Sequence, residues 1–177
     1  MSRIEARRLF FVIATILLLT ISVFPQAPLP SGCSYDLGFS PGGTSLEVVL
    51  KAINASKITL LVACYEFTDR DIAETIEAAA HRGVKVRIVA DYKAAQQKYS
   101  QTRILKAVGI PIRLDDRYSI HHHKFMVIDS LSIETGSFNY TTAAIKHYAE
   151  NALVLWNVKP LADEYTREFE RLWGESE

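Results

Sequence analysis

The sequence is poor in cysteine, and this scarcity excludes two kinds of protein. Its 177 residues include two cysteines, Cys33 and Cys64, too few for the disulfide framework of a small secreted module or for a four-thiolate metal site. The two could form a single disulfide in an oxidising compartment. Cys64 ends an apolar run, however, and free cysteine is among the most buried residue types. The pattern favours a buried free thiol at Cys64, with the disulfide as the alternative.

An excess of charge of either sign is also missing. The chain has 20 basic and 20 acidic residues, and its formal net charge at pH 7 is +0. Without Arg3, Arg7, Arg8 and Glu5, which belong to the N-terminal segment described below, 17 basic and 19 acidic residues remain and the net charge is −2. General attraction to a polyanion is therefore excluded, and any nucleic-acid binding must depend on a local basic groove.

Internal repeats and low-complexity tracts are absent, and the one long hydrophobic run lies at the N-terminus. Three arginines precede a sixteen-residue apolar stretch, residues 9–24, which Pro25 closes. Such a pattern is typical of a secretory signal, although an uncleaved anchor is the alternative because roughly 20 residues cross a bilayer. We expect residues 1–26 to be a signal peptide or anchor and residues 27–34 to be a linker, with the rest exported to the periplasm or secreted.

Helix and strand patterns alternate over the next part of the chain. The helical stretches have apolar residues on one face, whereas the strands are nearly continuous apolar runs, as in a sheet covered on both sides. In order, they are a helix at 44–53, a strand at 57–64, a helix at 71–82, a strand at 84–91, a helix ending near 108 and a strand at 110–114. A Thr44-x-x-Glu47 capping box and Asp69 mark the two helix starts. The alternation predicts parallel crossovers.

The pattern changes after Tyr118. Two apolar segments, 123–129 and 131–136, are too close for a helix between them and predict a hairpin that turns near Asp129. A further strand and a C-terminal amphipathic helix follow. The 49% hydrophobic composition is ample for a core. We therefore predict one α/β domain, residues 35–177, with a mixed, mainly parallel β-sheet flanked by helices.

Three histidines and a lysine precede the hairpin. Side chains two positions apart along a strand point to the same side, roughly 6.6 Å apart. His122 and Lys124 should thus project from one face, and His121 and His123 from the other. A strand cannot direct three adjacent histidines at one ion, and neither cysteine offers a further ligand. We therefore expect no metal cofactor.

The loop that follows the hairpin combines a glycine with neutral hydrogen-bond donors. Gly136 permits a tight turn, Ser137 and Asn139 offer side-chain donors, and adjoining backbone N–H groups can point at an anion. Together with the charge of Lys124, the loop would hold a phosphate. A plain helix cap is the alternative role for Asn139.

The run His122-x-Lys124-x4-Asp129-x6-Gly136-Ser137-x-Asn139 resembles the complete signature of the phospholipase D superfamily. The segments "ITLLVACYEFTD", "GVKVRIVAD" and "ENALVL" are also similar to the family, so the resemblance covers nearly everything after residue 35. Within the motif, Asp129 and Gly136 are expected to be structural. The short chain, export signal and single motif most resemble the small periplasmic bacterial endonucleases of this superfamily.

The resemblance implies a role for each matching residue. In this family the histidine matching His122 attacks phosphorus and forms a phosphohistidine. The residues matching Lys124 and Asn139 hold the phosphoryl oxygens, and Ser137 lies beside them. Glu150 matches an acid that orients the other ring nitrogen of the nucleophile, as the buried acid does in a serine triad.

The implied mechanism also needs a second histidine, which protonates the leaving oxygen and then activates water, yet the chain has one motif. His147 is a local substitute outside any matching pattern. We therefore expect a two-fold homodimer in which two copies of His122 share one composite site. A coupled pair of imidazoles predicts a bell-shaped pH dependence. Lys124 and Asn139 of both copies would supply charge stabilisation, so the reaction should need no metal.

The substrate has to be inferred from the surroundings of the site. Export, small size and basic surface segments favour nucleic acid, DNA or RNA, held by its backbone without base readout. The basic residues are Lys93, Lys98, Arg103, Arg117 and Lys146, each of which alone is typical of a solvated surface. A membrane-anchored phospholipase D or cardiolipin hydrolase is the alternative enzyme, and a non-catalytic phosphate-binding module is the alternative of another class. Tyr65 is expected mainly as a packing residue, and Asp91 as a candidate for contact with site residues.

Overall fold

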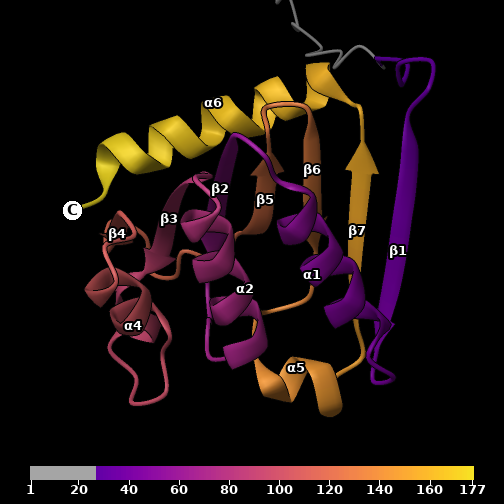
Figure 1. Cartoon of the computed structure of the whole chain (residues 1–177). Helices are drawn as coiled ribbons and strands as arrows, with labels where there is room; N and C mark the ends of the chain where they lie inside the picture. Colours follow the sequence, from indigo (N-terminus) through magenta and orange to yellow (C-terminus); the bar gives the residue numbers. More distant parts are fainter. Residues whose placement is uncertain (1–26) are drawn as a thin grey trace, which may run out of the picture.

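The structure, a computed structural model, describes residues 27–177, so the expected leader lies outside the described residues. A mixed sheet of seven strands forms its centre, in the order β1-β7-β6-β5-β2-β3-β4. The strands are β1 (Ser34–Ser40), β2 (Thr59–Cys64), β3 (Lys85–Asp91), β4 (Ile112–Asp115), β5 (Lys124–Ile128), β6 (Ser132–Gly136) and β7 (Glu150–Trp156). The helices are α1 (Thr44–Ala55), α2 (Arg70–His81), α3 (Tyr92–Ala95), α4 (Thr102–Ala107), α5 (Thr142–Lys146) and α6 (Lys159–Glu175). Figure 1 shows α1 and α2 in front of the sheet and α6 crossing its strands.

The sheet is mixed, as expected, but the expectation that it is mainly parallel is wrong. Parallel pairing is confined to β2–β3 and β3–β4, where helical connections link the strands. The pairs β1–β7, β7–β6, β6–β5 and β5–β2 are antiparallel. A parallel pair needs a long crossover, whereas β5 and β6 are joined by a tight turn in which Asp129 and Ser130 both have a φ of 53°. The hairpin expected near Asp129 is confirmed.

Two hydrophobic clusters cover the two faces of the sheet, because alternate residues of each strand point to opposite sides. Val62 and Cys64 face the cluster that includes α1 and α2, whereas Leu61 and Ala63 face the cluster under α6. Both cysteines are free, and Cys64 is fully buried. Because Cys33 packs against the α6 cluster, the two thiols lie on opposite faces, which confirms the buried free thiol. Within residues 27–177, no helix is both long and apolar enough to span a bilayer.

The edge strand β1 was not expected from the sequence. Its apolar residues alternate with small or polar ones, as in many strands, but the usual orientation is reversed. Tyr35, Leu37 and Phe39 are 68%, 46% and 57% exposed, whereas Asp36 points toward α1 and forms an ion pair with Lys51 at 2.7 Å. The alternation could have indicated the strand but not which face is covered.

The expected capping box at the start of α1 is wrong. Gly43 is the N-cap residue, and no side chain caps the helix. The hydroxyl of Thr44 instead accepts from the Phe39 N–H and donates to the Phe39 carbonyl, both at 2.8 Å. The threonine therefore closes the turn between β1 and α1 rather than the helix end. At α2 the expected cap is confirmed, because Asp69 accepts from the Ile72 N–H at 3.2 Å.

A buried carboxyl group lies beneath the loop that follows β6. Glu134 is 1% exposed and accepts a 2.7 Å hydrogen bond from the hydroxyl of Tyr140, which is also buried. Burial raises the pKa of Glu134 to about 8, and the hydrogen bond from Tyr140 partly opposes this effect. The folded protein therefore holds a proton on Glu134 at neutral pH.

The raised pKa makes stability depend on pH. Since the pKa of Glu134 in the folded protein lies above its ordinary value of 4.5, its contribution is complete below pH 4.5 and is lost as pH rises through about 8. The complete loss is on the order of 5 kcal/mol. Glutamine stays neutral at both pH values. We therefore expect the unfolding midpoint of Glu134→Gln, relative to that of wild type, to rise between pH 5 and pH 9 by about 2–4 °C for each kcal/mol that wild type loses. Thermal unfolding at both pH values measures this.

The exposed Glu47 provides the matched control, because Glu47→Gln should change the unfolding midpoint equally at pH 5 and pH 9. An equal difference between wild type and Glu134→Gln at both pH values would contradict a buried, protonated carboxyl group.

Candidate active site

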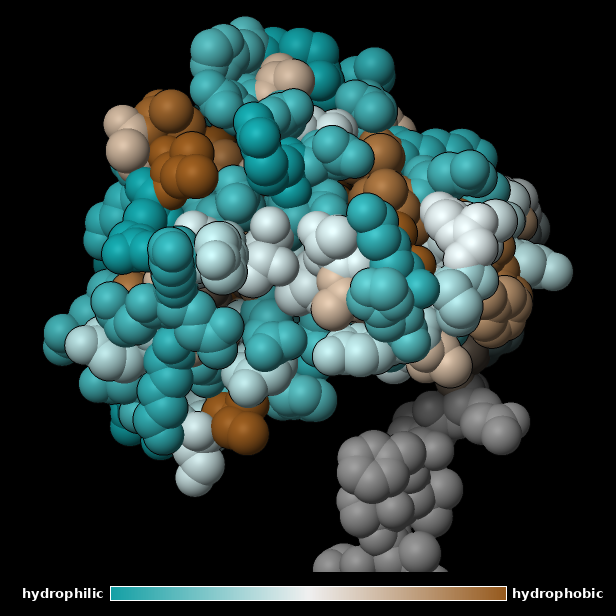
Figure 2. All heavy atoms as spheres, turned by 90° about the horizontal axis from the view of Figure 1, so that it is seen from below, coloured by the Kyte–Doolittle hydropathy of each residue, from teal (hydrophilic) through white to brown (hydrophobic). Residues whose placement is uncertain are grey.

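The motif residues gather at one edge of the sheet. β2, β3 and β4 end at this edge and β5 begins there, so Cys64 pairs with Lys124, and Asp91 with Asp115. β6 ends at the same edge with Gly136, and β7 begins there. Figure 2 views the molecule from the side on which α5 lies in Figure 1, and hydrophilic residues predominate on that face, with separate hydrophobic patches. The topology thus assembles polar residues from distant parts of the chain.

His122 and Lys124 lie beside each other against the ring of Tyr65. The His122 side chain is exposed, whereas Lys124 is only 8% exposed. The Lys124 ammonium donates a 2.8 Å hydrogen bond to the His122 main-chain carbonyl. The Tyr65 ring centroid lies 5.0 Å from that of His122 and 5.4 Å from Lys124 Nζ. Tyr65 is thus more than a packing residue, since an aromatic face attracts a nearby cation.

The electrostatics of Lys124 follow from its burial. Burial lowers its pKa from the ordinary value, and the carboxylates of Glu150 and Glu66 oppose this by raising it. A poorly hydrated ammonium interacts strongly with an anion that replaces the missing water. Lys124 is therefore suited to bind a phosphoryl oxygen beside His122.

The loop after β6 is attached to β7 through backbone contacts. A Cβ atom on Gly136 would lie 2.1 Å from the carbonyl oxygen of Asn151, so only glycine fits there. That carbonyl accepts the N–H groups of Ser137 and Phe138, and the Ser137 hydroxyl accepts from the Asn151 N–H at 3.1 Å. The expectation that adjoining backbone N–H groups point at an anion is therefore wrong for these two, because β7 already uses them.

Asn139 does not cap α5, so the alternative role considered for it is excluded. Thr141 is the N-cap residue, and its hydroxyl accepts from the Ala144 N–H at 3.1 Å. The Asn139 Oδ1 atom is buried without a hydrogen-bond partner within residues 27–177. A buried amide oxygen without a partner is costly, and such atoms are common at functional sites.

Glu150 and Asp129 occupy different edges of the sheet. Glu150 begins β7 at the site edge, opposite Ser40 of β1, and within the described chain no hydrogen bond joins it to His122. Asp129 lies at the other edge, where its carboxylate accepts from the backbone N–H groups of residues 57–59 at 2.7–3.2 Å. These bonds attach the hairpin to the start of β2.

The basic residues expected to bind substrate are all exposed but do not form one cluster. Lys93, in α3, donates to the Ser119 carbonyl at 3.4 Å. Arg117 lies in the same loop as Ser119, and Lys146 lies in the last turn of α5. Lys98 borders a separate hollow of about 530 Å³, and Arg103 donates to the Lys98 carbonyl at 3.4 Å. His147 is an exposed residue at the end of α5.

Two pockets meet at His122 and His123. The first, of about 400 Å³, is lined by His122, His123, Lys124, Phe125, Thr135, Gly136, Glu164, Tyr165 and Glu168. The second, of about 330 Å³, is lined by Tyr118, Ile120, His121, His122, His123 and Arg171. The exposed imidazole of His122 therefore faces space on two sides. Within residues 27–177, no group of three or more His, Cys, Asp or Glu side chains could hold a metal ion.

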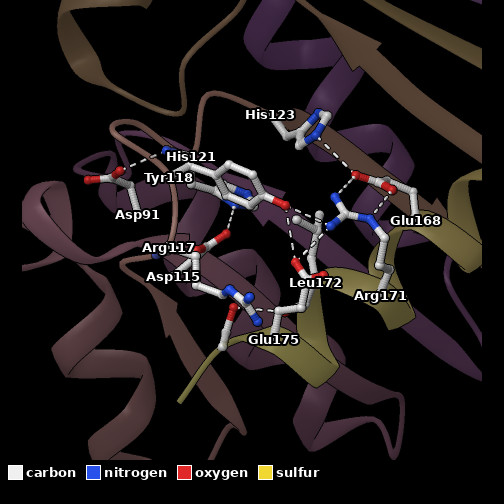
Figure 3. A network of polar contacts seen from close by, with 11 residues as sticks. Asp91, Asp115, Arg117, Tyr118, His121, His123, Glu168, Arg171, Leu172 and Glu175 are labelled. Carbon is white, nitrogen blue, oxygen red and sulfur yellow. Dashed lines mark hydrogen bonds and ion pairs between the residues drawn. The ribbon is translucent and has the colours of Figure 1, made fainter.

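Apart from Asp91, which was expected to contact residues of the site, the polar network next to the motif was not foreseen from the sequence (Figure 3). The His121 Nδ1 atom donates to the Asp115 carboxylate at 2.8 Å, and both side chains are fully buried. On the other side, Glu168 of α6 lies 3.4 Å from His123 and forms an ion pair with Arg171. The alternation of the three histidines indicated that His121 faces away from His122, but nothing in the sequence indicated its partner.

Comparisons with known proteins give one matching family and several similar proteins. A family profile described as "Cardiolipin synthase, PLD-like domain" matches residues 49–173. The mitochondrial cardiolipin hydrolase of Canis lupus familiaris is 34% identical over 155 residues, which are 85% of this chain and 58% of that protein. A phospholipase D of Rickettsia felis is 32% identical over 127 residues, 72% of this chain and 63% of that protein. The chain thus spans a little over half the length of these curated relatives.

Among solved structures, the chain is similar to Nuc from Salmonella typhimurium, a phospholipase D family member. The two share 35% sequence identity with a TM-score of 0.80, and the match covers 82% of this chain and 97% of Nuc. NucT from Helicobacter pylori has the same fold, with 23% identity, a TM-score of 0.73 and coverage of 81% and 98%.

Proposed function

Because this chain belongs to the phospholipase D superfamily of phosphodiester-cleaving enzymes, we propose that it is an exported endonuclease that hydrolyses nucleic acid without sequence specificity. The observation that carries the proposal is the exposed His122 imidazole beside the buried Lys124 ammonium, both against the ring of Tyr65. Similarity to Nuc over nearly all of that protein supports nucleic acid as the substrate. The basic, apolar N-terminal segment supports export.

The proposed reaction has two displacement steps at phosphorus. Neutral His122 attacks, so that an N–P bond forms and a P–O bond breaks, while a second imidazole gives its proton to the leaving oxygen. That imidazole then takes a proton from water, the water oxygen attacks phosphorus, and the N–P bond breaks. The Lys124 ammonium and the Asn139 Nδ2–H group donate to the non-bridging oxygens, where negative charge accumulates. Glu150 adds negative charge near the Lys124 ammonium, and Ser137 keeps the loop in place by accepting the Asn151 N–H.

The second imidazole comes from a second copy of the chain in this proposal. The uncovered row of Tyr35, Leu37 and Phe39 supports it, because exposed apolar residues on a sheet face mark an interaction surface. The row reaches the site, since Phe39 pairs with Asn151, whose carbonyl holds the loop after β6. The shared site requires a two-fold contact that extends from this face to His122, which precedes β5, three strands from β1 in the sheet.

A membrane-anchored phospholipase D or cardiolipin hydrolase is the second candidate. The names of the curated relatives favour it, and an anchor at residues 1–26 would hold the domain at a bilayer. Both candidates use the same residues on a phosphodiester, so the substrates distinguish them.

Three substrates given to the purified full-length protein in EDTA test the proposal. We expect nicking of supercoiled plasmid and cleavage of a chromogenic phosphodiester, without release of phosphatidate from cardiolipin vesicles. Phosphatidate release without nicking would favour the lipid hydrolase. Activity that EDTA abolished and Mg²⁺ or Zn²⁺ restored would contradict the metal-independent mechanism.

A further inference from the structure

The residue that precedes His122 is held by two buried carboxylates. Asp91 and Asp115 are neighbours in the register of β3 and β4, at the end of each strand. Asp91 accepts the backbone N–H of His121 at 2.9 Å, and Asp115 accepts the ring Nδ1–H of the same residue at 2.8 Å. The side chains of His121 and Asp115 have no exposed surface. Both the main chain and the side chain of His121 are thus fixed (Figure 3).

Each carboxylate also uses its second oxygen locally. Asp91 accepts from the Ala94 N–H at 2.8 Å and so caps α3, and Asp115 accepts from the Arg117 N–H at 3.0 Å. A carboxylate with both oxygens bound has little freedom to rotate, so the two strand ends form a rigid support for His121.

The residue that follows His122 is held from the other side. His123 lies 3.4 Å from Glu168 of α6, and Arg171 bonds both Glu168 and the hydroxyl of Tyr118, in the same loop as His121. By contrast, no hydrogen bond or ion pair involves the His122 ring within residues 27–177, and Tyr65 is its aromatic contact. The ring position is therefore set largely by the backbone on either side.

We propose that His121, held by Asp115 and Asp91, is a positioning residue that fixes the backbone of His122 and so aims its imidazole between the two pockets. The inference rests on the proposed function, in which His122 is the nucleophile. Reacting groups have to be placed to within about 0.5 Å of the productive geometry. A displacement of about 1 Å can lower a rate about 10²-fold.

The chemistry of the His121 ring is consistent with a role beyond packing. Its Nε2 atom is buried without a partner within the described chain, a cost that an apolar residue would avoid. Burial lowers the pKa of His121, while Asp115 from β4 and Asp91 from β3 oppose this effect, and His123 adds to it. The neutral ring donates Nδ1–H to Asp115. Protonation at acid pH would add a buried N–H without an acceptor, so the support should weaken as pH falls.

Two substitutions of His121 in the full-length protein separate positioning from packing. Glutamine keeps an N–H donor for Asp115 and does not titrate, whereas alanine removes the donor. For the chromogenic phosphodiester, we expect His121→Ala to lower kcat about 10- to 100-fold with KM within about 3-fold of wild type. We expect His121→Gln to keep kcat within about 3-fold of wild type and to lose less activity at acid pH.

Asp115→Ala tests the other half of the contact. We expect it to lower kcat as His121→Ala does, and the double variant His121→Ala/Asp115→Ala to be no worse than either single change, since the two act as a unit. The exposed His81 of α2, 3.7 Å from Glu77, provides the control, and His81→Ala should leave kcat unchanged. Thermal unfolding of every variant shows which ones are folded.

The possible results separate this inference from the proposed function. A folded His121→Ala with the kcat of wild type would overturn the inference, and so would a folded His121→Gln as impaired as His121→Ala. If His121→Ala does not fold, the decrease of kcat with falling pH in His121→Gln decides. A decrease identical to that of wild type overturns the inference. A wild-type protein that cleaves neither plasmid nor the chromogenic ester would refute the proposed function instead.

Discussion

Replacing His122 by asparagine is expected to lower kcat for plasmid and for the chromogenic phosphodiester by about 10³-fold or more, because the covalent step loses its nucleophile. The side chain is exposed and its ring makes no hydrogen bond within residues 27–177, so the unfolding midpoint should stay the same. Initial rates at saturating substrate, with thermal unfolding of the same sample, measure both. The matching change His81→Asn, on the exposed face of α2, should leave kcat intact.

The same variant tests whether the site is shared. After subunit exchange in an equal mixture of wild type and His122→Asn, about one quarter of the dimers contain two intact histidines. The mixture should therefore retain about one quarter of the activity that wild type shows at the same total concentration of chain. Retention of about one half would mean that each chain works alone, and wild-type rates in pure His122→Asn would refute the assignment of the nucleophile.

Replacing Leu37 by arginine is expected to convert a dimer into a monomer and to lower kcat/KM by at least about 100-fold. The reason is that a positive charge in the middle of the apolar row of β1 would be buried without a partner on association. The monomer would then lack the second imidazole, and a general acid or base contributes about 10²–10⁴-fold. Light scattering for the mass and initial rates for the activity measure the two effects on one preparation.

Ile58 offers a control of the same chemistry at another place. It is 64% exposed and precedes β2 at the edge that Asp129 occupies, away from His122. Ile58→Arg should therefore leave both mass and rate unchanged. A fully active Leu37→Arg monomer would contradict the shared site, and an unchanged Leu37→Arg dimer would place the interface elsewhere.

Most of the elements were predictable because their sequence patterns are strong. The apolar runs of β2 and β3, the amphipathic face of α2 and the tight turn near Asp129 depend on residues close together in the sequence. β1 was missed because its exposed face is the apolar one, which reverses the usual pattern. The proportion of parallel pairing was overestimated because the partner of a strand depends on how the connections fold, which the residues of the strand do not encode.

In the site, too, features that depend on residues close together in the sequence were predictable, and contacts between distant segments were not. The spacing of the motif predicted that His122 and Lys124 belong together, since two positions along an extended chain share a side. It did not predict that the N–H groups of Ser137 and Phe138 bond to Asn151, or that Tyr65 contacts both motif residues. These contacts join segments that only the sheet order brings together.

By itself, then, the sequence determined the family and the class of fold and predicted the residues that we propose carry the chemistry, because each of these depends on residue types at short, fixed separations. Only the tertiary structure decided what surrounds them: the carboxylates of β3 and β4 that hold His121, the ring of Tyr65 against His122 and the uncovered apolar face of β1. Asp115 and His121 are six positions apart, but Asp91 and His121, and Tyr65 and His122, are tens of positions apart. These contacts depend on strand order, register and burial, which are properties of the whole folded chain.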